Sequence, residues 1–210
     1  MRTNTANDPK MRKIVAGLFI SMDGVVESPE QWGFQYFNDE MTEMIAAGIA
    51  QADAVLLGPR TYAAFAKLWP NQGNEVPMAN FLNNSPKYVV SGTPDTLRWQ
   101  PATLIKGVLS EELAKLKQKP GKNIQIPGSP RLVRSLLRDG LLDEVSLSIC
   151  PIVVGSGLRL FDEGITRMNL KLIDARPFST GAVSVTYQPL PPGDPAPSRP
   201  VDFPEAAARK

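Results

Sequence analysis

The 210-residue sequence contains no histidine and a single cysteine, Cys150. Without histidine, Ser-His-Asp triads, imidazole acid-base relays and His-ligated metals are impossible. One cysteine can form neither a cysteine-rich zinc site nor an internal disulfide, and it suits a reducing compartment. Cys150 lies in an apolar alternating segment, so we interpret it as a buried structural thiol. Any chemistry must therefore use carboxylates, hydroxyls, lysines, backbone amides or a bound cofactor, and no metal site is expected.

The net charge is also small, and long apolar runs are absent from the sequence. Lys plus Arg number 23 and Asp plus Glu number 21, so the formal net charge of +2 gives no case for a nucleic-acid or membrane-surface partner. No apolar run approaches the roughly 18 residues that a membrane-spanning helix needs, and residues 1–10 lack an apolar signal core. We expect a cytoplasmic protein in which any anion site is local.

The order of apolar and turn-forming segments predicts the domain organisation. Residues 1–11 are expected to be a disordered lead, residues 12–188 one domain, and residues 189–210 an extended Pro-rich tail. Strands are expected at 13–21, 53–57, 87–91, 103–105, 123–126, 145–149, 170–175 and 182–187, and helices beginning near 39, 59, 111 and 130. Strands and helices alternate until the final strands, which indicates an α/β fold with a mainly parallel sheet and antiparallel edge strands.

Two of the expected helix starts combine glycine, proline, arginine and a hydroxyl: Gly58-Pro59-Arg60-Thr61 and Gly128-Ser129-Pro130-Arg131. Each directly follows a buried strand, with proline suited to the first helical position and Ser129 suited to the N-cap. Helix N-termini offer unpaired N–H groups and the positive end of a dipole, which bind phosphate. The two starts favour a nucleotide with more than one phosphate, although each alone is common in proteins that bind no ligand.

Residues 153–161, VVGSGLRLF, are a look-alike of a dinucleotide-binding loop. The fingerprint needs glycine or alanine at position 160, which is Leu, and a long helix after it, which the next residues do not predict. No Walker A motif occurs either. We interpret Gly155 and Gly157 as permitting a tight turn and a close backbone approach to a ligand. A Rossmann dehydrogenase is the weaker alternative.

Six segments, taken in order, resemble the dihydrofolate-reductase-like family, most closely the C-terminal reductase domain of the bifunctional riboflavin-biosynthesis deaminase-reductase. They are Ser21-Met22-Asp23-Gly24-Val25-Val26, Leu56-Leu57-Gly58-Pro59-Arg60-Thr61-Tyr62, Lys87-Tyr88-Val89-Val90-Ser91, Gly128-Ser129 with Leu132-Val133 and Leu136-Leu137, Gly140-Leu141-Leu142-Asp143-Glu144-Val145, and Pro151-Ile152-Val153-Val154-Gly155-Ser156-Gly157 with Leu160-Phe161. The similarity covers about residues 12–188. It implies a three-layer α/β/α fold whose central sheet has about eight strands, with NADPH bound across the strand ends.

The resemblance also implies cofactor-binding roles for single positions. Gly58, Arg60 and Thr61 would lie at one cofactor phosphate, and Ser91 would lie near the adenosine phosphate region. Gly128 and Ser129, followed by Arg131, would meet the pyrophosphate. Gly155 would border the cleft. Asp23 and Gly24 would belong to the loop that closes over the nicotinamide. Position 92 is Gly where relatives commonly carry arginine, so the choice between NADPH and NADH stays open.

A proton donor is needed for reduction of a C=N or C=O bond, and the candidates are Asp39, Glu40, Asp23 or water. Asp39 and Glu40 are equally well explained as first-turn acids of a helix that begins after Asn38. Trp32 and Phe34, in the preceding loop, suit either an apolar wall for a flat heterocycle or the core.

The resemblance implies an NADPH-dependent reductase similar to 5-amino-6-(5-phosphoribosylamino)uracil reductase, acting on a small heterocycle, and we expect a homodimer. The alternative from another class is a non-catalytic nucleotide-binding or dimeric interaction protein on the same fold.

Overall fold

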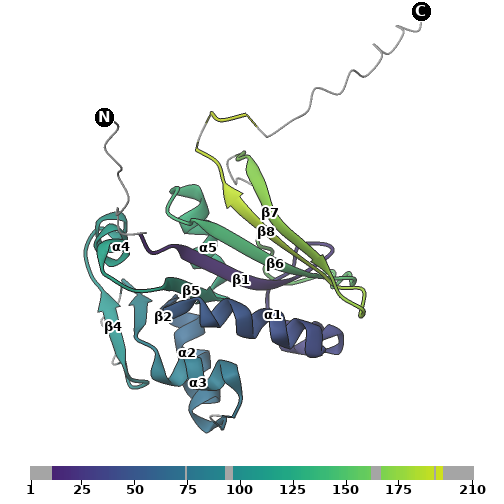
Figure 1. The fold of residues 1–210 in the computed structure, drawn as a ribbon, viewed down its shortest axis with the longest axis horizontal. Coiled ribbons are helices and arrows are strands. Elements are labelled where there is room, and N and C mark those ends of the chain that lie inside the picture. The colour runs from purple at the N-terminus through teal and green to yellow at the C-terminus, as the bar shows by residue number, and fades with distance from the viewer. Residues whose placement is uncertain (1–10, 74, 93–96, 162–166, 192, 196–210) are drawn as a thin grey trace, which may run out of the picture.

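Eight strands form one sheet in the computed structural model (Figure 1), which describes residues 11–73, 75–92, 97–161, 167–191 and 193–195. The strands are β1 (Ile14–Ser21), β2 (Ala52–Leu57), β3 (Lys87–Val90), β4 (Ala102–Ile105), β5 (Asn123–Pro127), β6 (Glu144–Cys150), β7 (Leu170–Pro177) and β8 (Val183–Pro189). All the strands expected from the sequence are present. The expected lead and tail lie, apart from residues 11, 189–191 and 193–195, outside the described residues.

The order of the strands across the sheet is β4-β3-β2-β5-β1-β6-β8-β7. The first six pair in parallel, whereas β8 pairs antiparallel with β6 and with β7. The expected fold class, mostly parallel with an antiparallel C-terminal edge, is confirmed. β5 lies between β1 and β2, which are consecutive in the chain. The carboxyl ends of the six parallel strands therefore share one edge of the sheet, the usual place for a ligand in such folds.

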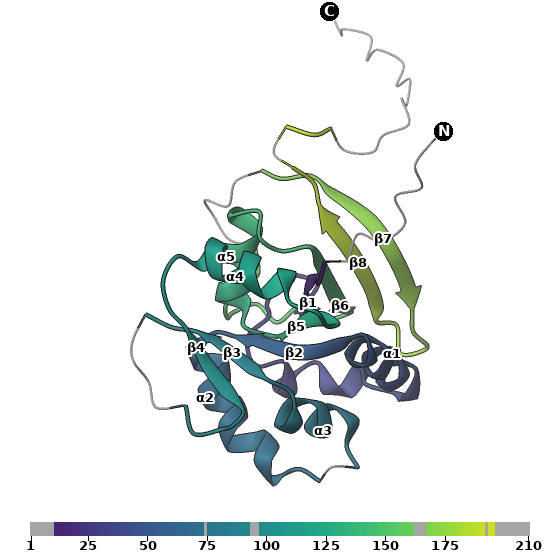
Figure 2. The ribbon, with the colours of Figure 1, turned by 60° about the vertical axis from the view of Figure 1, so that its left-hand side comes forward.

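Five α-helices lie among the described residues: α1 (Asp39–Ala50), α2 (Pro59–Leu68), α3 (Pro77–Asn84), α4 (Leu109–Gln118) and α5 (Pro130–Arg138). Figure 2 shows α1, α2 and α3 on one face of the sheet and α4 and α5 on the other. The expected three layers are thus present. α3 is not predicted by the sequence, because its two turns are flanked by Asn, Ser and Pro and look like a loop.

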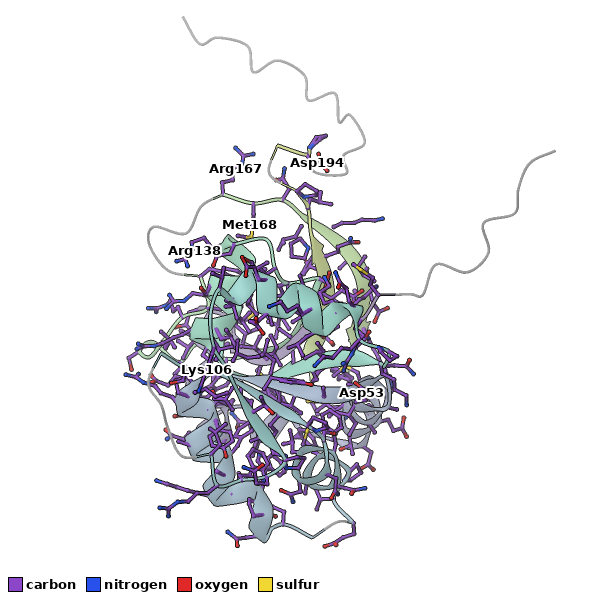
Figure 3. All side chains as sticks on the ribbon, turned by 90° about the vertical axis from the view of Figure 1, so that its left-hand side faces the viewer. Asp53, Lys106, Arg138, Arg167, Met168 and Asp194 are labelled. Atoms are coloured by element: carbon purple, nitrogen blue, oxygen red, sulfur yellow. The ribbon has the colours of Figure 1, made fainter. Side chains whose placement is uncertain are left out.

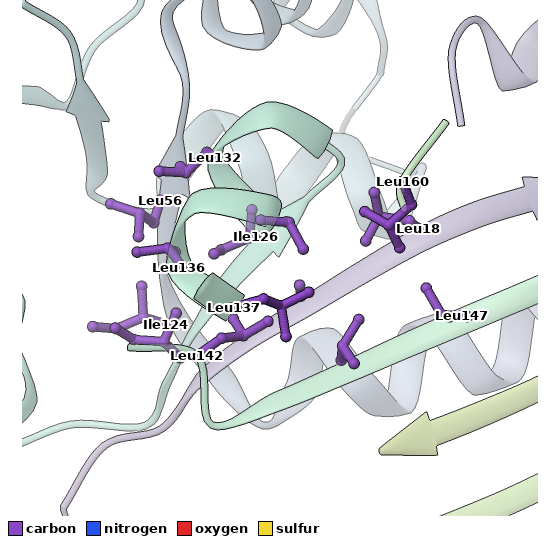
Figure 4. Packing of buried hydrophobic residues seen from close by; sticks show 14 of the residues in the cluster. Leu18, Leu56, Ile124, Ile126, Leu132, Leu136, Leu137, Leu142, Leu147 and Leu160 are labelled. Atoms are coloured by element: carbon purple, nitrogen blue, oxygen red, sulfur yellow. The ribbon is translucent and has the colours of Figure 1, made fainter. Parts of the chain in front are cut away.

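The larger core fills the space between the sheet and the α4–α5 layer (Figure 4). The four apolar residues that the sequence places on one face of the last helix are all buried in it: Leu132, Val133, Leu136 and Leu137. They pack against alternate residues of the strands, such as Leu56 and Ile126. Burying each of these side chains stabilises the fold by about 1.5–3 kcal/mol. This packing fixes where α5 begins.

A smaller core lies under α2 and α3, and the buried Lys87 adjoins it at Trp99. Lys87 Nζ donates to the carbonyls of Leu82 (2.7 Å) and Ser85 (2.9 Å) and lies 4.5 Å from the Trp99 ring centroid. Burial lowers the pKa of Lys87 to about 8. Its ammonium satisfies carbonyls at the end of α3, so we assign Lys87 a structural role.

The β7–β8 hairpin forms one end of the molecule (Figure 1), and nearly all of β7 is exposed. Arg167, Met168 and Asp194 lie together where β7 begins and β8 ends (Figure 3). The Asn169 side chain donates to the Asp194 carbonyl at 2.7 Å and closes this end. Within the described ranges, no helix has the length and apolar character to cross a membrane.

Candidate functional site

The two glycine-led helix starts meet at the carboxyl edge of the sheet. β2 and β5 are hydrogen-bonded neighbours, so α2 and α5 begin side by side. The Gly58 amide donates to Ser129 Oγ at 3.0 Å. A Cβ added to Gly58 would lie 3.8 Å from Ser129, and one added to Gly128 would lie 3.8 Å from the Thr61 methyl. We call residues 58–61 and 128–131 the paired helix starts.

Ser129 occupies the N-cap position of α5, but it does not cap the helix as its residue type predicts. Its φ is +53° and its side chain bonds no first-turn amide. The hydroxyl instead accepts the Gly58 amide, and the residue is only 3% exposed. A left-handed conformation costs a non-glycine residue about 1–2 kcal/mol. Ser28 is the other such residue in the described part of the chain. Strain of this kind collects at ligand sites.

The first turns of α2 and α5 retain free amides and positive charge. Each begins with proline, and no side chain caps either turn, so the next N–H groups have no intrahelical acceptor. Neither turn contains an acid, whereas α1 and α4 both begin with two. Arg60 and Arg131 are exposed and form no ion pair with any residue the structure describes. A cation at a helix N-terminus is unfavourable, and a bound anion would reverse that effect.

The remaining cofactor candidate on this side is Ser91. It follows β3, the neighbour of β2, and is half-buried. The structure therefore brings together the sequence-predicted residues Gly58, Arg60, Thr61, Gly128, Ser129 and Arg131, with Ser91 one strand further along the same edge.

A second pair of loops lies at the same edge, formed by residues 22–27 after β1 and residues 151–160 after β6. The Leu160 amide donates to the Gly24 carbonyl at 2.9 Å, and Gly24 has φ +85°. Further backbone bonds join the two loops along their length. β1 and β6 are parallel neighbours in the sheet, which brings the two loops together. The bridge between Val25 and Arg159 is antiparallel, so the loops form a pairing separate from the β1–β6 ladder.

The carboxylate of Asp23 joins these two loops. It accepts the Ser21 hydroxyl (2.6 Å) and the amides of Val154 (3.0 Å) and Gly155 (2.9 Å). Arg159 pairs with it at 3.3 Å. The Ser21 hydroxyl, followed by the Val154 amide, holds the pKa of Asp23 well below its ordinary value. Asp23 is therefore ionised at neutral pH and serves as an acceptor.

The loop that looks like a phosphate-binding loop thus already surrounds an anion of the protein itself. Gly155 has φ +86°, and its amide points to Asp23. Glu27 Oε2 accepts the Leu158 amide at 3.1 Å in the same way. We call Asp23 and Glu27, with the amides they accept, the acid clasp. The predicted cofactor contact of the Gly155 amide would require its bond to Asp23 to break.

The two acids in the first turn of α1, Asp39 and Glu40, differ in their hydrogen-bond partners. Glu40 accepts the amide and hydroxyl of Ser179 (both 2.8 Å) and the Asn38 side chain (2.9 Å). These bonds, the Ser179 amide first, lower the pKa of Glu40 to about 2. Glu40 therefore ties α1 to the β7–β8 turn. Asp39 is exposed in the same turn. Asn38 caps α1 by accepting the Met41 amide at 3.1 Å, which confirms the predicted N-cap.

Trp32 and Phe34, which the sequence places either in an apolar wall or in the core, differ in their burial. Trp32 is buried, and its indole N–H donates to the Glu27 carbonyl at 2.9 Å, which makes it structural. Phe34 is 57% exposed and packs with Phe19 and Phe37, the ring centroids lying 6.2–6.3 Å apart. We call these three the phenylalanine triad.

The thiol of Cys150 is fully buried, as the sequence predicts. Burial raises its pKa to about 11. A thiol of that pKa is inert at neutral pH.

Four residues of these groups are not singled out by the sequence patterns: Glu27, Arg159, Phe19 and Phe37. Phe37 lies directly before the N-cap Asn38, where an apolar residue commonly staples a helix, so nothing in the sequence signals that its ring is exposed. The pairing of Arg159 with Asp23 depends on β6 lying beside β1, and nothing in the local sequence gives that order.

Comparison with known proteins connects these features to relatives. Residues 12–184 match the family described as RibD C-terminal domain. YyaP of Bacillus subtilis strain 168, itself uncharacterized, is 31% identical over 187 residues, covering 86% of this chain and 97% of YyaP. A solved structure from Shewanella sp. PV-4, assigned to riboflavin biosynthesis, has a TM-score of 0.68 at 19% identity over 85% of this chain and 99% of that one. The riboflavin biosynthesis reductase Rib7 of Saccharomyces cerevisiae has a TM-score of 0.58 at 14% identity, covering 89% and 93%.

Proposed function

The chain belongs to the RibD C-terminal domain family, and on that basis we propose that it is an NAD(P)H-dependent reductase that transfers a hydride to a C=N or C=O group of a small heterocycle. One observation carries the proposal: the paired helix starts, two N-termini joined by a bond between residues 71 apart in sequence. Together they present first-turn amides and two guanidinium groups that form no ion pair with the described residues, which is the chemistry that a dinucleotide with two or three phosphates requires.

The residues fit such a cofactor in charge and in space. Arg60 and Arg131 supply cationic forks, the first-turn amides supply donors, and Gly58 and Gly128 leave room for phosphate oxygens to approach the backbone. The loop at residues 153–161 is the less suitable place for a cofactor phosphate, because the carboxylates of the acid clasp already accept its amides. We therefore assign the pyrophosphate to the paired helix starts and the adenosine side to Ser91.

NADPH is the cofactor we propose, and when bound it would supply the hydride. The chain's own part is to hold the ring and the acceptor in register and to provide a proton, so that carbon gains the hydride and the heteroatom gains the proton. Asp23 is ionised and engaged, so we assign it to fixing the loop that contains Gly24. Asp39, exposed at the start of α1, is the carboxyl we assign to proton delivery, with water as the alternative.

The substrate we propose is a small heterocycle of the kind reduced in riboflavin biosynthesis, with 5-amino-6-(5-phosphoribosylamino)uracil as the reference compound. It follows from family membership.

Titration with NADPH and NADH, followed by nicotinamide fluorescence, tests the proposal directly. We expect saturable binding of NADPH, and a loss of about tenfold in affinity in Arg60→Ala, the loss expected when one charge-assisted hydrogen bond is removed. If neither nucleotide binds at millimolar concentration, the proposal is wrong. Asp39→Asn should keep NADPH affinity and lower the rate of NADPH consumption, which separates proton delivery from binding.

A second candidate is a nucleotide-binding protein that acts through dimerisation rather than turnover, and the exposed strand β7 favours it. Leu172 and Ile173 on this strand are 52% and 46% exposed. The discriminating result would be NADPH binding with no NADPH consumption over a panel of heterocycles, in both the parent protein and Asp39→Asn. Sedimentation analysis of Leu172→Lys would then show whether β7 joins two copies.

A further inference from the structure

Arg159 holds together the two loops that the acid clasp joins, and it does so through three acceptors. Its Nε donates to the Asp23 carbonyl at 2.9 Å, and its Nη2 donates to the Gly155 carbonyl at 3.2 Å and to Asp23 Oδ2 at 3.3 Å. Two of these acceptors are backbone oxygens, one in each loop. A surface ion pair needs only the carboxylate, and such pairs contribute little to stability. The planar guanidinium instead fixes the spacing of two backbones, which suits a positioning role.

The loop at residues 22–27 is bonded to its neighbour along its whole length. The Met22 amide donates to the Ile152 carbonyl at 2.8 Å, and the Val26 amide donates to the Leu158 carbonyl at 2.9 Å. The side chains of Val25 and Val26 are buried, at 1% and 6% exposed. Loops that open and close on a ligand are drawn from the least bonded and least buried parts of a fold. This loop is not such a segment.

Gly24 is the part of this loop that stays open while its neighbours are packed. A Cβ added at Gly24 would meet no atom within 4 Å, whereas one added at Gly157 in the facing loop would lie 3.0 Å from Val25 Cγ1. The Gly24 carbonyl is nevertheless held, because it accepts the Leu160 amide at 2.9 Å. Free space for a ligand is therefore present beside Gly24 with the loop already bonded in place.

We propose that Arg159 is a positioning residue of the reductase, which holds residues 22–27 against residues 151–160 so that Gly24 is in its working position before the cofactor binds. This inference rests on the proposed function and adds to it. The resemblance drawn from the sequence implies a loop that closes over the nicotinamide, whereas the bonds of Arg159 make that closure unnecessary. Affinity that a closing loop would lose to its own ordering is then retained.

Amide hydrogen exchange of the unaltered protein, with and without NADPH, tests the proposal. Without NADPH, the amides of Val26, Leu158 and Leu160 should exchange at least about 100-fold more slowly than in an unfolded chain, because their acceptors are already in place. Saturating NADPH should change these rates by less than about twofold. Rates that are fast in the unliganded protein and fall only when NADPH binds would overturn the proposal, because the loop would then close on the cofactor.

Arg159→Gln shows whether the guanidinium is what holds the loops. In the unliganded variant the same three amides should exchange about tenfold faster than in the parent, and NADPH should slow them again. Arg138→Gln is the matched control, because it also removes an arginine paired with an aspartate at 3.0 Å, but at the end of α5. The control should leave the three rates unchanged. Unchanged exchange in unliganded Arg159→Gln would show that the positioning role is wrong, even if NADPH affinity fell.

Stopped-flow nicotinamide fluorescence gives a readout that a general loss of stability would not change. In the parent and in Arg138→Gln, the observed rate of NADPH binding should rise linearly with NADPH concentration, because no loop step accompanies binding. In Arg159→Gln the rate should level off at high concentration, because loop closure becomes a separate step. The same dependence on concentration in the parent and in Arg159→Gln, whether linear or levelling, would contradict the proposal.

These measurements separate the inference from the proposed function. The exchange comparison between the parent and Arg159→Gln needs no cofactor. If neither NADPH nor NADH binds at millimolar concentration, the reductase proposal is wrong, while faster exchange in the unliganded variant still supports the hold of Arg159 on the loops. If NADPH binds and the loop amides are unprotected until it does, the reductase proposal stands and the positioning role of Arg159 is overturned.

Discussion

The paired helix starts and the acid clasp are built from similar parts and behave in opposite ways. Both follow parallel strands at one edge of the sheet, and both contain a glycine with φ +86°, Gly128 in the first and Gly155 in the second. In the clasp, Asp23 and Glu27 occupy the amides. In the helix starts the first turns contain no acid, and each contains an arginine, Arg60 or Arg131. A backbone that can bind an anion is therefore available to a ligand only where the chain supplies no anion itself.

The largest effect should come from removing the cations of the helix starts. Arg60→Ala combined with Arg131→Ala should weaken NADPH binding about 100-fold, because each charge-assisted contact contributes about 1.5–3 kcal/mol and 1.4 kcal/mol is tenfold. Fluorescence titration measures it. Arg138→Ala is the control, since Arg138 (labelled in Figure 3) lies at the other end of α5. Its guanidinium pairs with Asp139 at 3.0 Å. A similar loss in Arg138→Ala would point to general charge rather than to a site.

Gly128 and Gly155 have the same φ, so alanine variants at these two positions compare the helix starts and the clasp directly. Alanine at either position costs about 1–2 kcal/mol of backbone strain, so both variants should lose similar stability. Gly128→Ala should in addition weaken NADPH binding about tenfold, because its Cβ would obstruct the close approach of a phosphate to the backbone. Gly155→Ala should change NADPH binding by less than about twofold, because the clasp already uses that loop. The reverse order would favour the Rossmann interpretation of residues 153–161.

Asp23→Asn tests the clasp through pH. The pKa of Asp23 is depressed in the folded protein, so its stabilisation is complete above the unfolded pKa of about 3.9 and is lost as pH falls toward the lower folded value. At pH 7 the variant should melt several degrees below the parent, and the gap should narrow below pH 4. Thermal unfolding by circular dichroism measures both. A gap that is constant with pH would mean that the charge of Asp23 does not matter.

The smallest expected difference separates two variants of Ser129, whose hydroxyl joins the two helix starts. Ser129→Ala leaves the buried Gly58 amide without an acceptor and should lower the free energy of unfolding by about 1–3 kcal/mol. Ser129→Gly loses the same acceptor but relieves the left-handed strain, so it should be more stable than Ser129→Ala by about 1 kcal/mol. Urea unfolding of the pair measures the difference, and equal stabilities would show that φ +53° costs nothing here.

The fold was predictable from the sequence because its elements have strong local signals. The apolar runs of the strands, Pro59 and Pro130 at first helical positions and Gly140 ending α5 at φ +66° are all local features. α3 was missed because its two turns are short and rich in asparagine. The sequence also anticipated that two helix starts would share an edge, because parallel strands require it.

The inner arrangement of the site was not predictable. Ser129 was expected to cap its own helix, but tertiary packing gives its hydroxyl to Gly58. Asp23 was considered as a proton donor, and only the position of the loop after β6 reveals how many donors surround it. The sequence shows which groups are present, whereas the strand order decides which of them become partners.

The position of β5 between β1 and β2 affects when the site can form while the protein is being synthesised. A nascent chain that has released only β1 through β4 has the first helix start but neither the second nor the strand that places it, because β5 and α5 emerge later. Long-range strand insertion of this kind is slow to form. If the paired helix starts bind the dinucleotide as proposed, binding should appear only once translation has passed residue 138, where α5 ends.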